Sequence, residues 1–329
     1  MLTFTKIIGS ELNIFVSTGS KAKEYKKILA EEIKTQSLDC NIVEDIGRSG
    51  DVNAIIYSDE SEISDFSIFP NNTVIFSIFA GVEKTLLNKS IRQPLVRLID
   101  IEMTECMAEW CTAHVLRYHL DLDEFIKPEK NEWKIYSKER LLANQVHIGI
   151  LGLGTLGTAA ANKLKKLDFN VTGWSTTEKS LSGIKSLVGP NGLAKILSNS
   201  DYLILLLPLT EETKHIINSD SLKIVKNGAI LINAGRGGLI EDNDLLEALD
   251  SGKLSRCTLD VFNKEPLPKE HPFWFHDKVT VTPHISAPTR LQSSIKSILK
   301  NIGRIKSLGV RLFSSTNLLD QSLFLLRLS

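Results

Sequence analysis

Three polar residues in the second half of the sequence could together reduce a 2-oxo acid with a nicotinamide cofactor: Arg236, Glu265 and His284. The planar, permanently charged guanidinium of arginine can bind a carboxylate and a carbonyl oxygen together, which lysine cannot. Histidine titrates near neutrality and can protonate the alkoxide that forms when hydride arrives. A carboxylate beside the imidazole stabilises its protonated form and fixes its tautomer. Taken singly, each residue also has an ordinary explanation: an exposed charge, a loop acid before proline, and a capped core histidine.

Each of these residues follows a short apolar run that predicts a β-strand, at 229–233, 257–261 and 280–282. The carboxyl ends of parallel strands share one edge of a sheet, and ligands of doubly wound sheets bind beyond that edge. We therefore expect the guanidinium, the carboxylate and the imidazole to converge there. Placement of these groups on separate faces would exclude the chemistry.

A glycine-rich segment predicts a dinucleotide site. The apolar run 146–151 ends in Gly152-x-Gly154-x-x-Gly157, and helix-forming residues follow. The start of a helix presents free backbone N–H groups to phosphates. Gly152 would permit the tight turn, Gly154 the approach of pyrophosphate, and Gly157 the packing of helix on strand. The cofactor-binding turn would also include Thr155 and Leu156. A flexible glycine-rich loop is the alternative interpretation.

Apolar runs alternate with helical patterns along the chain, which is typical of parallel α/β layers. The length of 329 residues suggests about two domains. The expected strands are 12–17, 52–58, 73–79 and 95–100 in the first part, and 146–151, 170–174, 202–207, 229–233, 257–261 and 280–282 in the second. The expected helices are 21–35, 103–122, 241–249 and 289–307, and the polar stretch 127–139 resembles a surface connection.

The composition, 42% hydrophobic and 24% charged residues, is that of an ordinary soluble globular protein. The 39 basic residues balance 39 acidic ones, which argues against nucleic acid or an anionic membrane as partner. The longest apolar stretch, 202–209, is too short to span a bilayer, and no signal peptide is visible. Four scattered cysteines have no CxxC spacing, as expected of reduced thiols in a cytoplasmic protein. His114 and His119 have the wrong offset for a metal pair, so we expect no metal site.

From about residue 50 to 305 the chain resembles the D-isomer-specific 2-hydroxyacid dehydrogenases, and most of all their glyoxylate/hydroxypyruvate reductase A branch. The resemblance implies an α/β fold of two doubly wound parallel-sheet domains. A Rossmann-type NAD(P)-binding domain, 102–286, would be inserted into a flavodoxin-like substrate domain, 1–101 plus 287–329. The matching stretches are Gly152–Gly157, Leu207–Asn218, Gly228–Gly238, Leu259–Pro268 and Phe273–His284.

The resemblance also implies roles for the polar residues. Arg236 would bind the substrate, His284 would donate the proton, and Glu265 would be the partner of His284. Asp260 would bind the nicotinamide carboxamide, although it could instead cap the end of a strand. In the first domain, the backbone of Ala80 and Gly81 would hold the substrate carboxylate; a plain turn is the alternative. The further cofactor-binding residues implied are Leu207, Pro208, Thr213, Ala234 and Gly235.

The choice between cofactors depends on the end of the second strand. An NAD enzyme carries there an acid that binds the ribose 2′-hydroxyl. This chain has instead Trp174, Ser175 and Thr176, with Lys179 close behind. The reductase A branch shares the Trp-Ser opening but then carries arginines, whereas this chain has Thr176 and Glu178. We expect NADPH to be favoured over NADH, with Glu178 weakening the phosphate site.

The function implied is the NAD(P)H-dependent reduction of glyoxylate or hydroxypyruvate to glycolate or D-glycerate by a homodimer. The alternatives are another D-2-hydroxyacid dehydrogenase, of the D-lactate or phosphoglycerate type, and a non-catalytic NAD(H)-sensing protein on the same fold. Two positions depart from the family: Glu83 replaces the usual Asp, and Tyr57 the usual Trp of the branch. Trp274 matches an aromatic position near the site but could equally be a core residue. The tail 308–329 is unlike the family and is expected to be loosely packed or disordered.

Overall fold

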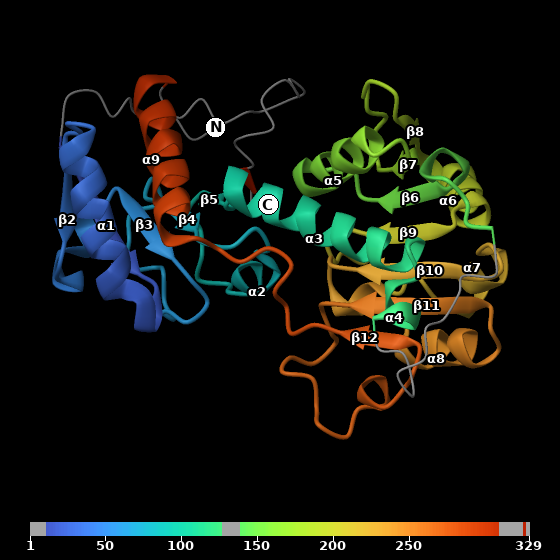
Figure 1. Cartoon of the computed structure of the whole chain (residues 1–329). Coiled ribbons are helices and arrows are strands. Elements are labelled where there is room, and N and C mark those ends of the chain that lie inside the picture. The colour runs from blue at the N-terminus through green and yellow to red at the C-terminus, as the bar shows by residue number, and fades with distance from the viewer. Residues whose placement is uncertain (1–10, 127–138, 309–324, 327–329) are drawn as a thin grey trace. The chain divides into compact units, whose positions relative to one another are not determined.

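The computed structural model describes residues 11–126, 139–308 and 325–326. The chain divides into two compact units (Figure 1): Met1–Met103 with Thr289–Ser329, and Thr104–Pro288. The expected surface connection 127–139 lies outside the described residues except for Glu139. Most of the tail 308–329 also lies outside them.

The first unit is built on a six-stranded sheet in the order β13-β5-β4-β3-β1-β2. Strands β1 to β5 are parallel, in the 2-1-3-4-5 order of flavodoxin-like folds, and β13 adds one antiparallel pair at the edge. Helices α1 and α9 pack against each other. The strands are β1 (Leu12–Ser17), β2 (Cys40–Val43), β3 (Ala54–Tyr57), β4 (Val74–Ser77), β5 (Leu95–Val96) and β13 (Leu325–Leu326), and the helices are α1 (Ala22–Thr35), α2 (Glu83–Leu86) and α9 (Leu291–Leu308), with 3-10 turns η1 (Gly19–Lys21) and η2 (Ile46–Asp51).

The second unit is built on a seven-stranded parallel sheet in the order β12-β11-β10-β9-β6-β7-β8. Counted from β6, this is the 3-2-1-4-5-6 order of a Rossmann fold with a seventh strand added. The strands are β6 (His147–Leu151), β7 (Asn170–Trp174), β8 (Lys185–Leu187), β9 (Tyr202–Leu205), β10 (Ala229–Asn233), β11 (Leu254–Leu259) and β12 (Val279–Val281). The predicted pair of doubly wound parallel sheets is confirmed.

The helices of the second unit form two apolar layers over its sheet. One cluster joins α3 and α5 to the strands, and the other joins α6, α7 and α8 to them. Their bounds are α3 (Ile101–His119), α4 (Leu122–Phe125), α5 (Thr155–Lys166), α6 (Gly189–Asn199), α7 (Ser219–Ile224) and α8 (Asp242–Asp250), with 3-10 turns η4 (Ala143–Gln145), η5 (Gly237–Leu239) and η6 (Pro272–Trp274). Because both faces are covered, the central strands are buried, which explains their continuous apolar sequences.

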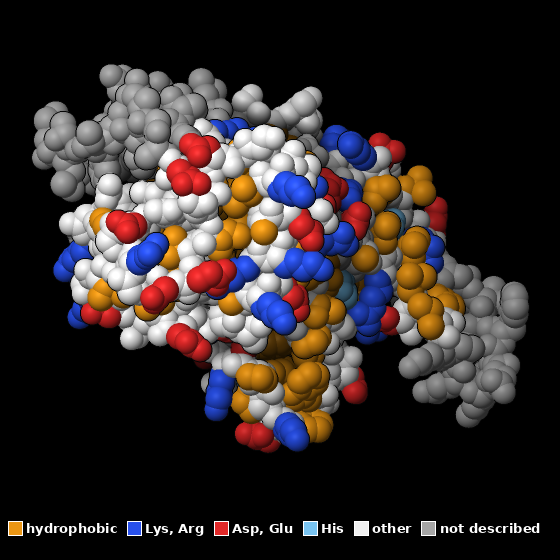
Figure 2. Space-filling model, turned by 90° about the vertical axis from the view of Figure 1, so that its left-hand side faces the viewer, with side chains coloured by type: hydrophobic (Ala, Val, Ile, Leu, Met, Phe, Trp, Pro, Cys, Tyr) orange, Lys and Arg blue, Asp and Glu red, His pale blue; other side chains and the backbone are white. Residues whose placement is uncertain are grey.

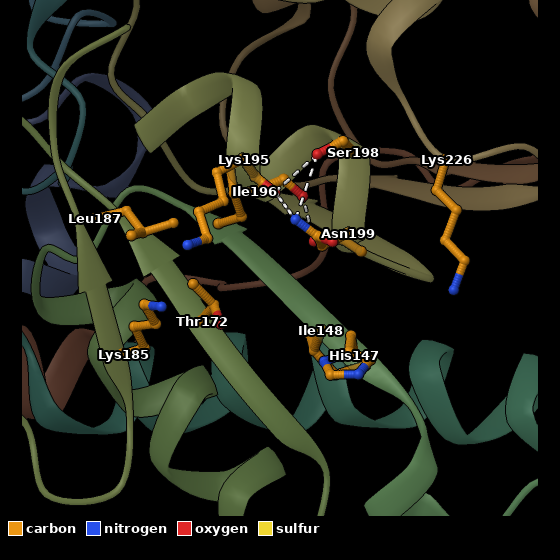
Figure 3. Close-up of a pocket in the computed structure, with 11 residues that line it drawn as sticks. His147, Ile148, Thr172, Lys185, Leu187, Lys195, Ile196, Ser198, Asn199 and Lys226 are labelled. Carbon is orange, nitrogen blue, oxygen red and sulfur yellow. Dashed lines mark hydrogen bonds between the residues drawn. The ribbon is translucent and has the colours of Figure 1, made fainter. Parts of the chain in front are cut away.

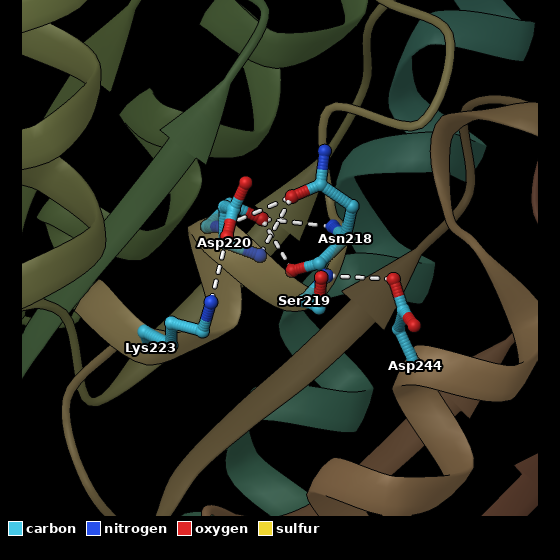
Figure 4. Close-up of polar contacts among 6 residues, drawn as sticks. Asn218, Ser219, Asp220, Lys223 and Asp244 are labelled. Atoms are coloured by element: carbon cyan, nitrogen blue, oxygen red, sulfur yellow. Dashed lines mark hydrogen bonds and ion pairs between the residues drawn. The ribbon is translucent and has the colours of Figure 1, made fainter.

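A side-chain cap begins α7, which follows the segment that matches the family at 207–218. The Asn218 carboxamide oxygen accepts hydrogen bonds from the N–H groups of Asp220 and Ser221, at 3.0 Å each (Figure 4). Asp244 of α8 accepts a bond from the Ser219 N–H at 2.6 Å, and Asp220 pairs with Lys223 at 2.7 Å. These bonds satisfy N–H groups that the helix leaves free and fix its start against α8.

Tyr118 fastens α3 to the sheet. Its hydroxyl lies 2.6 Å from Oγ1 of Thr258 and 3.3 Å from Oγ1 of Thr280, on β11 and β12.

On the face shown in Figure 2, acidic and basic side chains occur together among neutral ones. None of the helices in the described part of the chain has the length and apolar character needed to cross a bilayer.

Candidate active site

The glycine turn of the second unit leaves open the position where a phosphate would approach. Strand β6 ends at Leu151 and α5 begins at Thr155. A Cβ atom added to Gly157 would lie 1.8 Å from the carbonyl oxygen of Gly152, so helix and turn are packed as closely as glycine allows. A Cβ atom added to Gly154 would meet nothing within 4 Å. An exposed, unobstructed backbone at the start of a helix fits a pyrophosphate.

A continuous row of loops connects this turn to the polar residues along the carboxyl edge of the sheet. A Cβ atom on Gly152 would lie 2.5 Å from the oxygen of Leu206, and one on Gly235 would lie 2.9 Å from the oxygen of Leu207. One on Gly237 would lie 2.0 Å from the carbonyl carbon of Phe262. The loop after β6 therefore contacts the loop after β9, which contacts the loop after β10, which in turn contacts the loop after β11.

His284 and Glu265 meet at this edge. The Nδ1 atom of His284 lies 2.8 Å from Oε2 of Glu265, while Oε1 of Glu265 accepts the N–H of Phe262 at 2.9 Å. The two side chains are 52% and 36% exposed, so Nε2 of the imidazole can reach a ligand. The predicted pairing of these residues is present, with the carboxylate on one ring nitrogen and the other left for chemistry.

Arg236 lies in the neighbouring loop, directly after β10. Its Nη1 donates to the oxygen of Gly235 at 2.7 Å, and its own carbonyl oxygen accepts the Asn233 side-chain amide at 2.9 Å. Because Gly237 packs on the backbone of Phe262, the Arg236 loop abuts the Glu265 loop. The half-buried Arg236 thus lies in a loop that neighbours the Glu265 loop on the same sheet edge.

The carboxylate of Asp260 accepts hydrogen bonds from within the protein. The side chain is fully buried, and its carboxylate accepts bonds from the residues after β12: the Thr282 hydroxyl and the N–H groups of Ile285 and Ser286. These contacts join the end of β11 to the turn after β12. The contact with a nicotinamide carboxamide stays a prediction.

The other expected cofactor residues line the glycine turn and the end of β7. Ser175 is buried and its hydroxyl donates to the oxygen of Thr177 at 2.7 Å, whereas Thr176 and Glu178 are exposed. The backbone N–H of Lys179 donates to the Ser186 hydroxyl at 3.0 Å. This bond does not involve the side-chain ammonium of Lys179. The exposed carboxylate of Glu178 is therefore the acidic group beside the expected 2′ position.

The segment after β9 carries Leu207, Pro208 and Thr213. The buried Thr213 hydroxyl donates to the oxygen of Pro208 at 2.7 Å and accepts the Thr210 N–H at 2.8 Å, closing the turn. Leu207 is buried and Pro208 exposed. Trp274 is 47% exposed, with Nε1 bonded to the oxygen of Pro268 at 3.0 Å, so the core interpretation of this ring does not hold.

In the first unit, the loop with Ala80 and Gly81 follows β4 and is half-buried. Its position is fixed by bonds from the Leu98 N–H to the oxygen of Phe79 at 3.0 Å, and from the Phe79 N–H to the Ser77 hydroxyl at 3.0 Å. Tyr57 belongs to the apolar core, where its ring meets Phe66 edge to face.

Arg97 is a charged residue at this loop that sequence reasoning missed. Burial lowers the pKa of its guanidinium, and the charge of Glu83 opposes that shift. Its neighbours Val96 and Leu98 are buried core residues. A charge between two apolar residues at a strand end was the signal that could have identified it.

A separate groove lies at the opposite, amino-terminal end of the second sheet. It has a volume of about 410 Å³ and includes His147, Lys185, Lys195 and Lys226 in its lining (Figure 3). His147 and Lys185 begin β6 and β8, so the groove opens away from the glycine turn. Ligands of doubly wound sheets bind at the other edge.

Comparison with known proteins identifies the family. The model of the D-isomer specific 2-hydroxyacid dehydrogenase NAD binding domain matches residues 112–286. The chain belongs to this family. Glyoxylate/hydroxypyruvate reductase A of Serratia proteamaculans is 39% identical over 236 residues, which are 69% of this chain and 75% of that protein. The predicted family and branch are confirmed, and the protein is an NAD(P)-dependent oxidoreductase.

Solved structures of the family match almost the whole chain. A D-isomer specific 2-hydroxyacid dehydrogenase from Xanthobacter autotrophicus, in complex with NADPH and MES, has a TM-score of 0.82 at 30% identity, over 94% of this chain and 98% of its own. An NADPH-dependent glyoxylate/hydroxypyruvate reductase from Sinorhizobium meliloti, with NADP and sulfate, has a TM-score of 0.79 at 31% identity, over 90% and 95%. The enzyme thus shares its fold with NADPH-binding relatives.

Proposed function

We propose that this enzyme reduces glyoxylate or hydroxypyruvate to the 2-hydroxy acid, with NADPH favoured over NADH. The observation that carries the proposal is the pairing of His284 with Glu265, next to the Arg236 loop and in line with the glycine turn. The names of the relatives support the substrates, and their bound NADP or NADPH supports the cofactor.

The proposed reaction assigns one task to each polar residue. Arg236 binds the carboxylate and carbonyl oxygen through its fork of N–H donors. A bound reduced nicotinamide supplies hydride to the carbonyl carbon. His284 donates its Nε2 proton to the carbonyl oxygen, because Nδ1 faces Glu265 at 2.8 Å. The half-exposed ring then recovers a proton from solvent.

We assign cofactor binding to the second unit and a share of substrate binding to the first. Gly152, Gly154 and Gly157 form the turn for the pyrophosphate, and Ser175, Thr176 and Lys179 lie at the expected 2′ position. The backbone of Ala80 and Gly81 binds the substrate carboxylate. These roles rest on the resemblance together with the positions described above.

Steady-state kinetics tests the substrate and the cofactor together. Glyoxylate, hydroxypyruvate and pyruvate are each assayed with NADPH and with NADH. The proposal expects the highest kcat/KM for NADPH with glyoxylate or hydroxypyruvate. A preference for pyruvate would favour a D-lactate dehydrogenase, and the absence of turnover with all three would favour the non-catalytic alternative.

Substitution of Arg236 tests the site. Arg236→Ala should remove most turnover, by about 10²-fold or more, while NADPH affinity is kept. Arg236→Lys should restore little, because an ammonium lacks the fork of donors. Arg256→Ala, at an exposed position on β11, is the matched control. Equal loss of cofactor affinity and turnover in Arg236→Ala would contradict the role.

We further propose a homodimer in the cytoplasm. The dimer rests on the resemblance, and light scattering on the 36.6 kDa chain measures it directly: a mass of one chain would exclude it. The location rests on four free thiols, at Cys40, Cys106, Cys111 and Cys257, which suit a reducing compartment.

A further inference from the structure

Asp260 is a fully buried carboxylate whose hydrogen bonds all run to one turn. It directly follows β11, and its side chain has no exposed area. Oδ1 accepts the Thr282 hydroxyl at 2.6 Å and the Ile285 N–H at 2.9 Å. Oδ2 accepts the Ser286 N–H at 2.9 Å. These donors lie on both sides of His284.

The backbone of His284 is also tied to Asp260. The His284 N–H donates to the carbonyl oxygen of Asp260 at 2.9 Å and to that of Thr282 at 3.0 Å. His284 adopts a left-handed conformation with φ of 53°. A residue with a side chain enters this region only at a cost, so surrounding contacts must hold it there. The bonds from 282, 285 and 286 to one carboxylate are such contacts.

The donors explain why this position carries an aspartate. An ionised carboxylate offers acceptor sites on both oxygens, whereas the amide of asparagine offers one oxygen and presents N–H groups on the other side. In asparagine, one of the donors from the turn would face another donor. Burial of a carboxylate is unfavourable unless such bonds are made. The charge and shape of Asp260 therefore match the turn at 282–286.

We propose that Asp260 is the positioning residue that holds the imidazole of His284 against Glu265, acting through the turn 282–286. This inference rests on the proposed role of His284 as proton donor. It gives Asp260 a task distinct from binding the nicotinamide carboxamide. The side chain has no exposed area, and the three donors whose bonds its oxygens accept all lie in this turn.

Two substitutions test the proposal, with one matched control. Asp260→Asn removes an acceptor and should lower kcat by about 10²-fold, since small misplacement of a reacting group has effects of that size. Thr282→Val removes only the hydroxyl bond and should lower kcat by about 3- to 10-fold. Thr280→Val, on β12, makes the same change beside Tyr118 and away from the turn; it should leave kcat unchanged.

The decisive readouts are cofactor affinity and the hydrogen bond between His284 and Glu265. The Nδ1 proton signal of His284, assigned by its loss in Glu265→Gln, should shift or vanish in Asp260→Asn and shift less in Thr282→Val. The NADPH Kd should change by less than about 3-fold, because contacts with cofactor are kept. A changed Nδ1 signal with a nearly unchanged NADPH Kd would show that the substitution acts on the turn 282–286 and not on the nucleotide site.

The opposite pattern would overturn the inference. If Asp260→Asn weakens NADPH binding as much as it lowers kcat and leaves the Nδ1 signal intact, the residue binds the carboxamide. If Asp260→Asn does not fold, Thr282→Val decides: a kcat and an Nδ1 signal equal to those of Thr280→Val contradict positioning. The Nδ1 signal is measured without substrate. Absence of 2-oxo acid reduction by the wild type would therefore refute the proposed function while the test of positioning still stands.

Discussion

The Nδ1 atom of His284 lies 2.8 Å from Oε2 of Glu265, across 19 residues of sequence. A carboxylate in this position selects the tautomer that places the other proton on Nε2 and stabilises the imidazolium. Proton donation by His284 therefore depends on the contact between these two side chains.

Glu265→Gln should lower kcat by about 10²-fold at neutral pH, because a neutral amide stabilises the imidazolium less than a carboxylate does. NADPH affinity should change little. Glu270→Gln, at an exposed position in the same loop, is the control. Stopped-flow reduction of glyoxylate measures the step directly. A rate equal to that of the control would remove Glu265 from the mechanism.

Alanine substitutions at two glycines of the same turn should affect two different properties, stability and NADPH binding. Gly157→Ala should destabilise the protein, since the new Cβ would lie 1.8 Å from the oxygen of Gly152. Gly154→Ala should keep the Tm within about 2 °C, because the new methyl group meets no protein atom within 4 Å, but it should weaken NADPH binding by about 10-fold or more.

Thermal melts and cofactor titration by fluorescence distinguish the two variants. An unchanged NADPH Kd in Gly154→Ala would show that the pyrophosphate does not approach this backbone. A normal Tm in Gly157→Ala would show that the turn can relax.

The sequence predicted the central strands because their apolar runs are continuous. It missed β2 (Cys40–Val43) and β8 (Lys185–Leu187), which are sheet edges with mixed, partly exposed residues. Their pattern resembles a loop because only one side of an edge strand is paired.

The pairing of His284 with Glu265 was predicted from residue types and from family spacing. The bonds from the turn 282–286 to Asp260 were not, because they join residues 22 to 26 positions apart through a left-handed backbone at His284. Residue types alone carry no information about which donors a buried carboxylate will meet. Only the three-dimensional structure shows which donors these are.

Removal of the negative charge at Glu178 should strengthen the preference for NADPH. Its exposed carboxylate lies in the loop after β7, next to Thr176 and Lys179, where a 2′-phosphate is expected. Glu178→Arg should raise the ratio of kcat/KM for NADPH over NADH by about 10-fold, since repulsion is replaced by a charge-assisted bond. Glu247→Arg, an exposed change of the same kind on α8, is the control. An equal ratio in both variants would place the 2′-phosphate elsewhere.

His114 should make the folded protein sensitive to mild acid. Burial lowers the pKa of this imidazole to about 4 from its ordinary 6.5, with a further contribution from the charge of Arg117. The ring centroid lies 4.3 Å from that of Trp110, with the two rings tilted at 52°, and Nδ1 lies 3.4 Å from Oγ1 of Thr258. The folded state therefore keeps the ring neutral where the unfolded state binds a proton. Stability should fall as the pH decreases from about 6.5 towards 4.

His114→Asn keeps a polar group near Thr258 but cannot be protonated. Its Tm should fall less between pH 7 and pH 4.5 than that of the wild type, by about 3 °C or more. His147→Gln changes an exposed histidine and should follow the wild type. Melts across this range by circular dichroism measure the difference. Parallel curves for wild type and His114→Asn would mean that the half-buried ring takes up its proton in the folded state without loss of stability.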